Sequence, residues 1–406
     1  MSAGPQARLT PDRPAAAGGT PVRATLLPFS KAQFDVEEEA AVVETLRSGW
    51  IATGPRVERF EGAFARTIGT AHAVGVGSCT AGLHLLLRAA GVGPGDEVIT
   101  SSMTFPATAN AILHCGATPV LADVLAGKLT LDPDAARAKL SARTRAILPV
   151  HLAGWPSEMR ALTEVSAGAG VALIEDASHA LGATYDGRQA GSLADGAAFS
   201  FYATKNITTG EGGMITTDHG EWVARLRTER LHGIDIDASR RDGADYRHWE
   251  AVSLGWKYNL CDIAAAIGLV QLGKLPAFLV RRRELDRRYR DVLAKQPAVD
   301  VIDGPDCAET AAHIFPLLVR LERLRIGRDE LLRALLAENI GVGVHFRALP
   351  MHRFFREELG CRPEDVPVAH AASERTLSIP LYPSLTDEEH GQVIEALLRI
   401  LRFYAV

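Results

Sequence analysis

The sequence predicts an α/β fold: a large domain built on a mostly parallel, mixed sheet, followed by a small α+β C-terminal domain. Two observations carry this prediction. From residue 72 onward, short β-rich runs alternate with stretches of helical spacing, as in βαβ units whose sheet is buried on both faces. In addition, the chain has 406 residues, 47% of them hydrophobic, which is enough for one large core and a smaller one.

The first elements are two helices, expected over residues 34–50 and 57–69 and closed by Gly49 and Gly69. The alternating part follows them. Its strands are expected at 72–78, 96–102, 118–124, 144–151, 171–178, 196–204 and 212–217, and its helices at 81–91, 106–116 and 157–170.

The C-terminal part begins with a long charged helix over about residues 275–296, which leaves the large domain. Its arginines at 281–283 are expected on a solvated face. After it come strand-like segments at 311–321 and 342–349 and helices at 328–341 and 386–404. We therefore divide the chain into a flexible N-terminal extension (1–26), a large domain (27–275) and a small C-terminal domain (276–406).

Composition excludes several classes of protein. A net charge of −5 and a pI near 6.2 leave no basic field for nucleic acid. The five cysteines lack metal-ligand spacing, so we expect free thiols in a reducing compartment and no metal site. We find no apolar run of transmembrane length and no leader core, so we expect a soluble, cytoplasmic protein without a membrane partner.

The chemistry is expected beyond the carboxyl ends of the strands, where open α/β sheets bind ligands. Gly77, Ser78, Cys79 and Thr80 stand directly before a helix, so backbone N–H groups and a hydroxyl can face a phosphate there. A plain helix cap is the alternative. Neither a GxGxxG nor a GxxxxGK[ST] motif occurs, which argues against a nicotinamide-linked reductase.

Further candidates follow other strands. Asp176 either caps a turn or pairs with a protonated ring nitrogen, and His179 lies three residues on. Phe105 is either a core residue or a stacking platform. Lys205, close to Ser200, is either exposed or a reactive amine. A phosphate cradle, an aromatic face, an acid, an imidazole and one lysine together match what pyridoxal 5'-phosphate (PLP) requires.

Several stretches carry a family resemblance, among them "IEDASHALGATYDGRQAGSLADGAAFSFYATKNITTGEGGMITT", "YNLCDIAAAIGLVQLGKL" and "LSIPLYPSLTDEE". They closely resemble the DegT/DnrJ/EryC1/StrS aminotransferases, which are PLP-dependent sugar aminotransferases of fold type I, the aspartate aminotransferase-like fold. The resemblance extends from about residue 27 to the end of the chain. It implies the same fold, the same cofactor and transamination of a sugar.

The resemblance also implies roles for single residues. Lys205 stands at the position of the Schiff-base lysine, Asp176 at that of the partner of the pyridine nitrogen, and His179 near the phenolic oxygen. Asn259 matches an asparagine that reaches the phosphate of the neighbouring subunit, which implies a homodimer with shared active sites. The remaining cofactor positions are Ser78, Cys79, Thr80 and Ser200 at the phosphate and Phe105 on the ring.

The implied substrates are L-glutamate as amino donor and a nucleotide-linked ketosugar as acceptor. The segment 341–355 is most similar to the branch that aminates C4 of UDP- or dTDP-linked 4-ketosugars. His345 and Arg347 are candidates to face the sugar nucleotide, although a structural strand histidine is an equal alternative. A 3-ketosugar or cyclitol aminotransferase remains an alternative, as does a non-catalytic PLP-fold regulator, which would be expected to lose Lys205 or Asp176.

Overall fold

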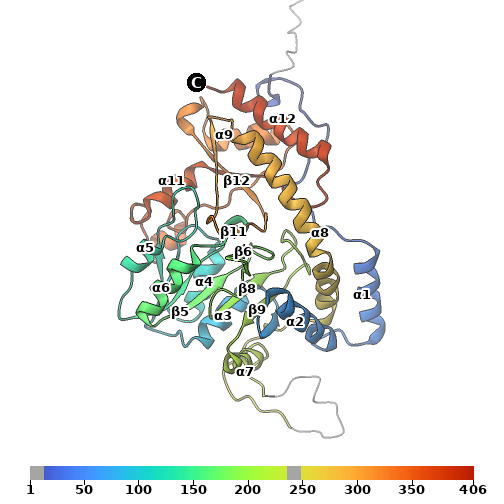
Figure 1. Ribbon diagram of the computed structural model, residues 1–406, viewed down its shortest axis with the longest axis vertical. Coiled ribbons are helices and arrows are strands. Elements are labelled where there is room, and N and C mark those ends of the chain that lie inside the picture. The colour runs from blue at the N-terminus through green and yellow to red at the C-terminus, as the bar shows by residue number, and fades with distance from the viewer. Residues whose placement is uncertain (1–12, 236–247) are drawn as a thin grey trace, which may run out of the picture.

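Figure 1 shows the computed structural model, which describes residues 13–235 and 248–406. A seven-stranded sheet lies at the centre of the large domain, in the order β1-β9-β8-β5-β4-β2-β3. β9 pairs antiparallel with both of its neighbours, and the other pairs are parallel, so the predicted mixed, mostly parallel sheet is confirmed. The strands are β1 (His72–Val76), β2 (Glu97–Ser101), β3 (Thr118–Ala122), β4 (Thr144–Leu148), β5 (Ala172–Asp176), β8 (Gly196–Ser200) and β9 (Gly213–Thr217).

Helices cover both faces of this sheet, because successive side chains of a buried strand point to opposite sides. On one face, Phe199 and Phe201 pack against Phe60 and Phe64, with ring centroids 5.0–5.6 Å apart. On the other face, Ala198 and its neighbours pack against α3. The helices are α1 (Val36–Ser48), α2 (Pro55–Ile68), α3 (Cys79–Ala89), α4 (Pro106–His114), α5 (Pro133–Ala138), α6 (Met159–Ala169) and α7 (Gly220–Glu229).

The small domain has its own antiparallel sheet, in the order β10-β12-β13, and its own buried core. Its strands are β10 (Val299–Val301), β12 (Phe315–Val319) and β13 (Thr376–Ile379), and its helices are α9 (Arg328–Ala337), α10 (Arg353–Glu357), α11 (Pro367–Arg375) and α12 (Asp387–Phe403). A further small sheet joins β11 (Ala308–Glu309), β6 (Thr184–Tyr185) and β7 (Arg188–Gln189). The predicted helix at 386–404 is confirmed as α12, which begins with a capping box at Thr386.

The long helix α8 (Asp262–Leu293) starts earlier than predicted and runs without a break past residue 275. The proposed domain boundary therefore falls inside one helix. Pro276 does not end it, because the helix packs against α1 and α2 on one side of this point and approaches β10 and α12 on the other. In Figure 1 it runs diagonally from the large domain into the small one.

α8 also corrects the expectation that no segment has the length and composition of a transmembrane helix. Over one 18-residue window its mean hydropathy is 1.8, and 44% of that window is buried inside the protein. Apolar residues of this helix, such as Ala265, Leu272 and Leu275, belong to the core that contains Phe60 and Phe64. The apolar window is thus also explained by packing against the large domain.

The predicted solvated face at 281–283 is wrong for its middle member. Arg282 is 2% exposed, and its Nη1 donates hydrogen bonds to the carbonyls of Ala312, His313 and Leu381. Burial lowers the pKa of this guanidinium to about 9. A charge pattern read along one helix cannot show that three carbonyls of the small domain converge on it.

The structure also corrects the expectations for two other segments, the N-terminal extension and the strand at 342–349. Within the predicted extension, residues 13–26 lie against it, and the Glu338 carboxylate accepts hydrogen bonds from Ala15 N and Val22 N, at 2.9 and 2.7 Å; residues 1–12 lie outside the described residues. The predicted strand at 342–349 is wrong, because only a single bridge joins Gly343 to Ser378 before the chain turns away.

Candidate active site

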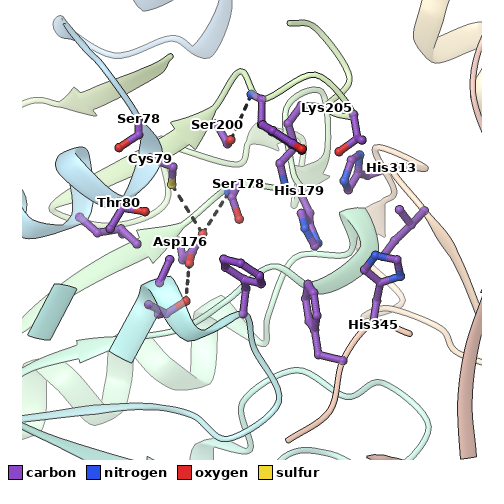
Figure 2. Close-up of a pocket in the computed structure, with 18 of the residues that line it drawn as sticks. Ser78, Cys79, Thr80, Asp176, Ser178, His179, Ser200, Lys205, His313 and His345 are labelled. Atoms are coloured by element: carbon purple, nitrogen blue, oxygen red, sulfur yellow. Dashed lines mark hydrogen bonds between the residues drawn. The ribbon is translucent and has the colours of Figure 1, made fainter. Parts of the chain in front are cut away.

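A cavity of about 460 Å³ opens between the two domains, where strand ends of the large sheet meet the small domain. Figure 2 shows the side chains that line it. The predicted residues that it brings together are Ser78, Cys79, Thr80, Phe105, Asp176, His179, Ser200, Lys205 and His345. These residues are up to 267 positions apart in the chain, so the fold has gathered them.

One end of the cavity is formed by the start of α3. Ser78 is its N-cap, and the Ser78 hydroxyl accepts a hydrogen bond from Ala81 N at 3.1 Å. The first N–H groups of a helix carry partial positive charge, so this end suits an anion. Gly213 on β9 leaves room for the turn, because a Cβ there would lie 2.6 Å from the Ser78 carbonyl carbon. Ser200, at the end of β8, lies across from Cys79 (Figure 2).

Asp176 ends β5 with its carboxylate held in one orientation. Its Oδ2 accepts a hydrogen bond from Thr108 Oγ1 at 2.8 Å, and its Oδ1 accepts one from Ser178 N at 3.1 Å. The residue is 4% exposed, and Cys79 Sγ lies 4.0 Å from Oδ1. Burial and the Asp176 charge raise the pKa of this thiol well above its ordinary value, so Cys79 stays a neutral thiol beside the carboxylate.

Lys205 follows β8, the strand next to β5, and lines the same cavity as Asp176. Desolvation lowers the pKa of its amine to about 8, although the charges of Cys79 and Asp176 act in the opposite direction. Within the described residues, no hydrogen bond or ion pair to its Nζ is found. An amine that titrates near neutral pH and is not tied to a partner can serve as a nucleophile or a base.

Among the described residues, three histidines line the wall across the cavity from Asp176: His179, His313 and His345 (Figure 2). Desolvation and the nearby Lys205 charge lower the pKa of all three, that of His345 to about 4. His179 Nδ1 accepts a hydrogen bond from Ala153 N at 3.3 Å. The neutral His179 ring therefore carries its proton on Nε2, as a donor.

Aromatic rings stand at the mouth of the cavity. Phe105 is 59% exposed, which excludes the core reading and leaves its face available for stacking. Its ring lies 6.0 Å from that of Phe346, which in turn stacks on His179 at 5.7 Å. Phe29 stacks on His345 at 5.1 Å. The cavity thus has flat apolar walls suited to a planar ring.

Two predicted residues do not line the cavity. Asn259 lies next to Val76, and its amide donates to Thr53 Oγ1 at 2.6 Å. Arg347 is exposed and directly follows Phe346, which does line the cavity. Their proposed contacts with a neighbouring phosphate and with a nucleotide remain predictions.

Sequence reasoning missed several lining residues, among them Thr108, Ser178, His313 and Phe346. Ser178 stands two residues after the end of β5 and Thr108 lies in the first turn of α4, just after Phe105, so the rule that located Phe105 and Asp176 could have found them. His313 precedes its strand instead of following one. No local signal marks such a position.

The donor set of the cavity fits PLP. A helix N-terminus with hydroxyls at one end suits a phosphate, a fixed carboxylate suits a protonated ring nitrogen, and an untied amine suits an aldehyde. The architecture and this donor set define the class: a PLP-dependent enzyme of fold type I.

Comparison with known proteins specifies the family. The profile of the DegT/DnrJ/EryC1/StrS aminotransferase family matches residues 32–398, and the chain belongs to this family. The spore coat polysaccharide biosynthesis protein SpsC of Bacillus subtilis is 43% identical over 378 residues, which are 93% of this chain and 97% of SpsC.

Solved structures agree. The PLP form of the putative sugar aminotransferase Spr1654 from Streptococcus pneumoniae is 32% identical with a TM-score of 0.86, covering 93% of this chain and 99% of that one. DesI, determined in the presence of its TDP-sugar product, is 32% identical with a TM-score of 0.83 and covers 95% of each chain. The chain is therefore an enzyme, a sugar aminotransferase, and its cofactor is PLP.

Proposed function

We propose that this enzyme transfers an amino group from L-glutamate to a nucleotide-linked ketosugar, at C4 of a UDP- or dTDP-4-ketosugar. The observation that supports transamination most directly is that Lys205 and Asp176, from neighbouring strands, line one cavity between two domains. Support for a nucleotide sugar comes from DesI, whose structure was determined with its TDP-sugar product.

We assign the cofactor contacts as the sequence predicted. The first turn of α3, with Ser78, Cys79 and Thr80, and Ser200 hold the phosphate. Asp176 keeps the pyridine nitrogen protonated, His179 donates Nε2–H to the phenolic oxygen, and Phe105 stacks on the ring. When bound, PLP supplies an electron sink for the negative charge that develops at the substrate carbon.

Lys205 has two tasks in this proposal. Its Nζ would hold the cofactor in the resting enzyme, and as a free amine it would move the proton at the reacting carbon of the substrate. A pKa of about 8 suits both tasks, because far more of the amine is neutral near physiological pH than at its ordinary pKa of 10.5. Asp176 stays fixed by Thr108 and Ser178 throughout.

The acceptor is expected to enter from the side of the small domain. His345 lines that wall, and Arg347 stands just outside it with an exposed guanidinium that no described residue binds and that can meet a diphosphate in bidentate fashion. A 3-ketosugar or a cyclitol ketone would use the same groups. Product analysis by NMR after reaction with a panel of ketosugar nucleotides decides between them: nitrogen at C3, or activity only on a free cyclitol ketone, would contradict the C4 assignment.

We further propose a soluble, cytoplasmic homodimer with shared sites. Val36, Val43 and Leu46 are spaced by seven and three residues on α1, so they lie on one face, and they are 42–75% exposed. Ile51, in the loop that follows, is 50% exposed. The same loop holds Asn259 through Thr53. A second copy covering this face would bring the Asn259 segment near a partner site.

Borohydride reduction of the purified enzyme followed by peptide mapping tests the central assignment. The reduced cofactor is expected on Lys205, because its amine faces the cavity. A label on another lysine, or no cofactor after reconstitution, would remove Lys205 from this role.

A further inference from the structure

His313 is a buried imidazole of the cavity that none of the roles above uses. It is 3% exposed, directly precedes Ile314 and β12, and lines the cavity together with Lys205. Its ring lies 4.4 Å from that of His179, and Figure 2 shows both rings on the Lys205 side of the cavity.

Asn206, which directly follows Lys205, determines which nitrogen of His313 carries the proton. Asn206 uses its amide hydrogens on the carbonyls of Leu181 and Ala311, at 3.2 and 2.8 Å. Its Oδ1 is therefore an acceptor, and it lies 3.1 Å from His313 Nδ1. Burial keeps His313 neutral by lowering its pKa well below the ordinary value. With the proton on Nδ1, the Nε2 of His313 presents a lone pair.

The backbone around His313 is also held on two sides. His313 N donates to the carbonyl of Ala153 at 3.2 Å, and the N–H of the same Ala153 donates to His179 Nδ1. Arg282 Nη1 donates to the His313 carbonyl at 3.0 Å. Ala153 thus holds the His179 ring and the His313 backbone, while Asn206 orients the His313 ring, so that His179 offers a donor and His313 an acceptor. No described residue hydrogen-bonds to His313 Nε2.

We propose that His313 Nε2 accepts a hydrogen bond from a hydroxyl of the acceptor substrate and is a specificity-determining residue of this enzyme. Asn206 and Arg282 are its positioning residues. The proposal rests on the proposed function, in which the acceptor is polyhydroxylated. A hydroxyl can donate to the lone pair, whereas the ionised carboxylates of the amino donor only accept hydrogen bonds. The same atom therefore favours a hydroxyl of the sugar over the carboxylates of glutamate.

The test separates the two half-reactions, each followed by the absorbance of the bound cofactor in single turnovers. His313→Phe keeps a ring of similar size and removes the acceptor. We expect its half-reaction with L-glutamate to stay within about two-fold of the wild-type rate constant. Its kcat/KM for the acceptor should fall about 10- to 100-fold, as for one lost hydrogen bond to an uncharged group.

Two further variants serve as controls. His313→Gln restores a side-chain acceptor and should recover most of the kcat/KM for the acceptor. His390→Phe removes another buried histidine, which contacts the Leu285 carbonyl in the small domain outside the cavity, and should leave both half-reactions unchanged. Melting curves of all three variants identify any loss of folding.

Deoxygenated acceptors locate the contact. The kcat/KM of the wild type should fall by the same factor with the one deoxy analogue that lacks the contacting hydroxyl. The kcat/KM of His313→Phe should be the same for this analogue as for the intact acceptor. Equal slowing of both half-reactions would show that His313 acts on Lys205 and would overturn the proposal, as would an unchanged acceptor half-reaction. If the wild type rejects nucleotide sugars and aminates a cyclitol ketone, the proposed function is wrong. The kcat/KM values of wild type and His313→Phe for that cyclitol and its deoxy analogues would then still test the role of His313.

Discussion

At the scale of single residues, Lys205 differs from a surface lysine in one measurable property. Desolvation lowers the pKa of its amine from about 10.5 to about 8. Because only the neutral amine attacks an aldehyde, capture of PLP by the apoenzyme should accelerate as the pH rises and level off above about 8. Stopped-flow absorbance over pH 6–10.5 measures this, with the range chosen to bracket both values. An inflection near 10 would contradict the buried position of the amine.

Asp176 is the second residue whose role can be tested alone. Asp176→Asn keeps the shape of the side chain and loses the charge that would hold a ring proton, so we expect PLP to stay bound and kcat to fall at least about 100-fold. Thr108→Val is the matched control. It removes the hydrogen bond to Asp176 Oδ2, at 2.8 Å, and should lower kcat much less than Asp176→Asn does. Near-normal turnover by Asp176→Asn would exclude its assigned role.

The residues that sequence reasoning predicted are those that follow a strand. Lys205, Asp176, Phe105 and the start of α3 all stand where a parallel sheet ends, so position in the pattern implied position in space. His313 was not predicted, because its position depends on a long-range hydrogen bond to Ala153, which lies more than 150 residues earlier in the chain. A hydrogen bond between residues so far apart does not affect the hydrophobic periodicity of the local sequence.

At the scale of elements, the edge strand β1 is closed by an ion pair instead of another strand. Glu61 and Arg230 are 5% and 3% exposed, and Glu61 Oε1 lies 2.5 Å from Arg230 Nη1. Glu61 also accepts from Gly75 N at 2.8 Å, while Arg230 donates to Gly75 O at 2.9 Å. The pair thus satisfies the N–H and the carbonyl of Gly75, in the strand that leads to the predicted phosphate-binding turn.

We predict that Glu61→Leu lowers the free energy of unfolding by about 3–5 kcal/mol, because it leaves a buried guanidinium without its partner. Thermal and urea denaturation of the apoenzyme measure the loss. Glu61→Gln should lower the free energy of unfolding by less, since the amide oxygen can still accept a hydrogen bond from Gly75 N. The double variant Glu61→Leu/Arg230→Met should recover part of the loss. Equal stability of Glu61→Leu and wild type would show that the edge does not depend on this pair.

Element prediction from sequence succeeded where periodicity and burial agree, as in α2, α12 and the strands of the large sheet. It failed where contacts between domains decide. α8 continues through Pro276 because both of its ends are packed, and the segment after Gly343 leaves the sheet after one bridge. Intrinsic helix and strand propensities explain neither the continuation of α8 through Pro276 nor the short pairing after Gly343.

For the whole molecule, the exposed apolar face of α1 should determine assembly. Val43→Asp together with Leu46→Asp places two charges on that face, so we expect a monomer by size-exclusion chromatography with light scattering. Activity should fall with dimerisation if sites are shared. The control Val280→Asp changes a more exposed apolar residue on α8, 71% exposed, and should leave the oligomeric state unchanged. A dimeric double variant would exclude α1 from the interface.

Subunit mixing tests whether the sites are shared. Lys205→Ala and Asn259→Ala chains, each impaired alone, should regain activity when refolded together, because half of the sites in a heterodimer then combine intact residues. The measurement is turnover of the mixture against each parent at equal protein concentration. Activity of the mixture no higher than the mean of its parents would place Asn259 outside the partner site.

The order of lining residues along the chain has an evolutionary consequence. Apart from Asn259, which is proposed to reach the site of a partner subunit, the groups assigned to the cofactor all precede residue 213, whereas His313, His345 and Phe346 come from beyond α8. Mutations in the C-terminal third can therefore remodel the wall proposed to meet the acceptor while Lys205 and Asp176 stay untouched. A lineage with this arrangement can acquire new sugars by drift in one stretch of its gene, under purifying selection on the other.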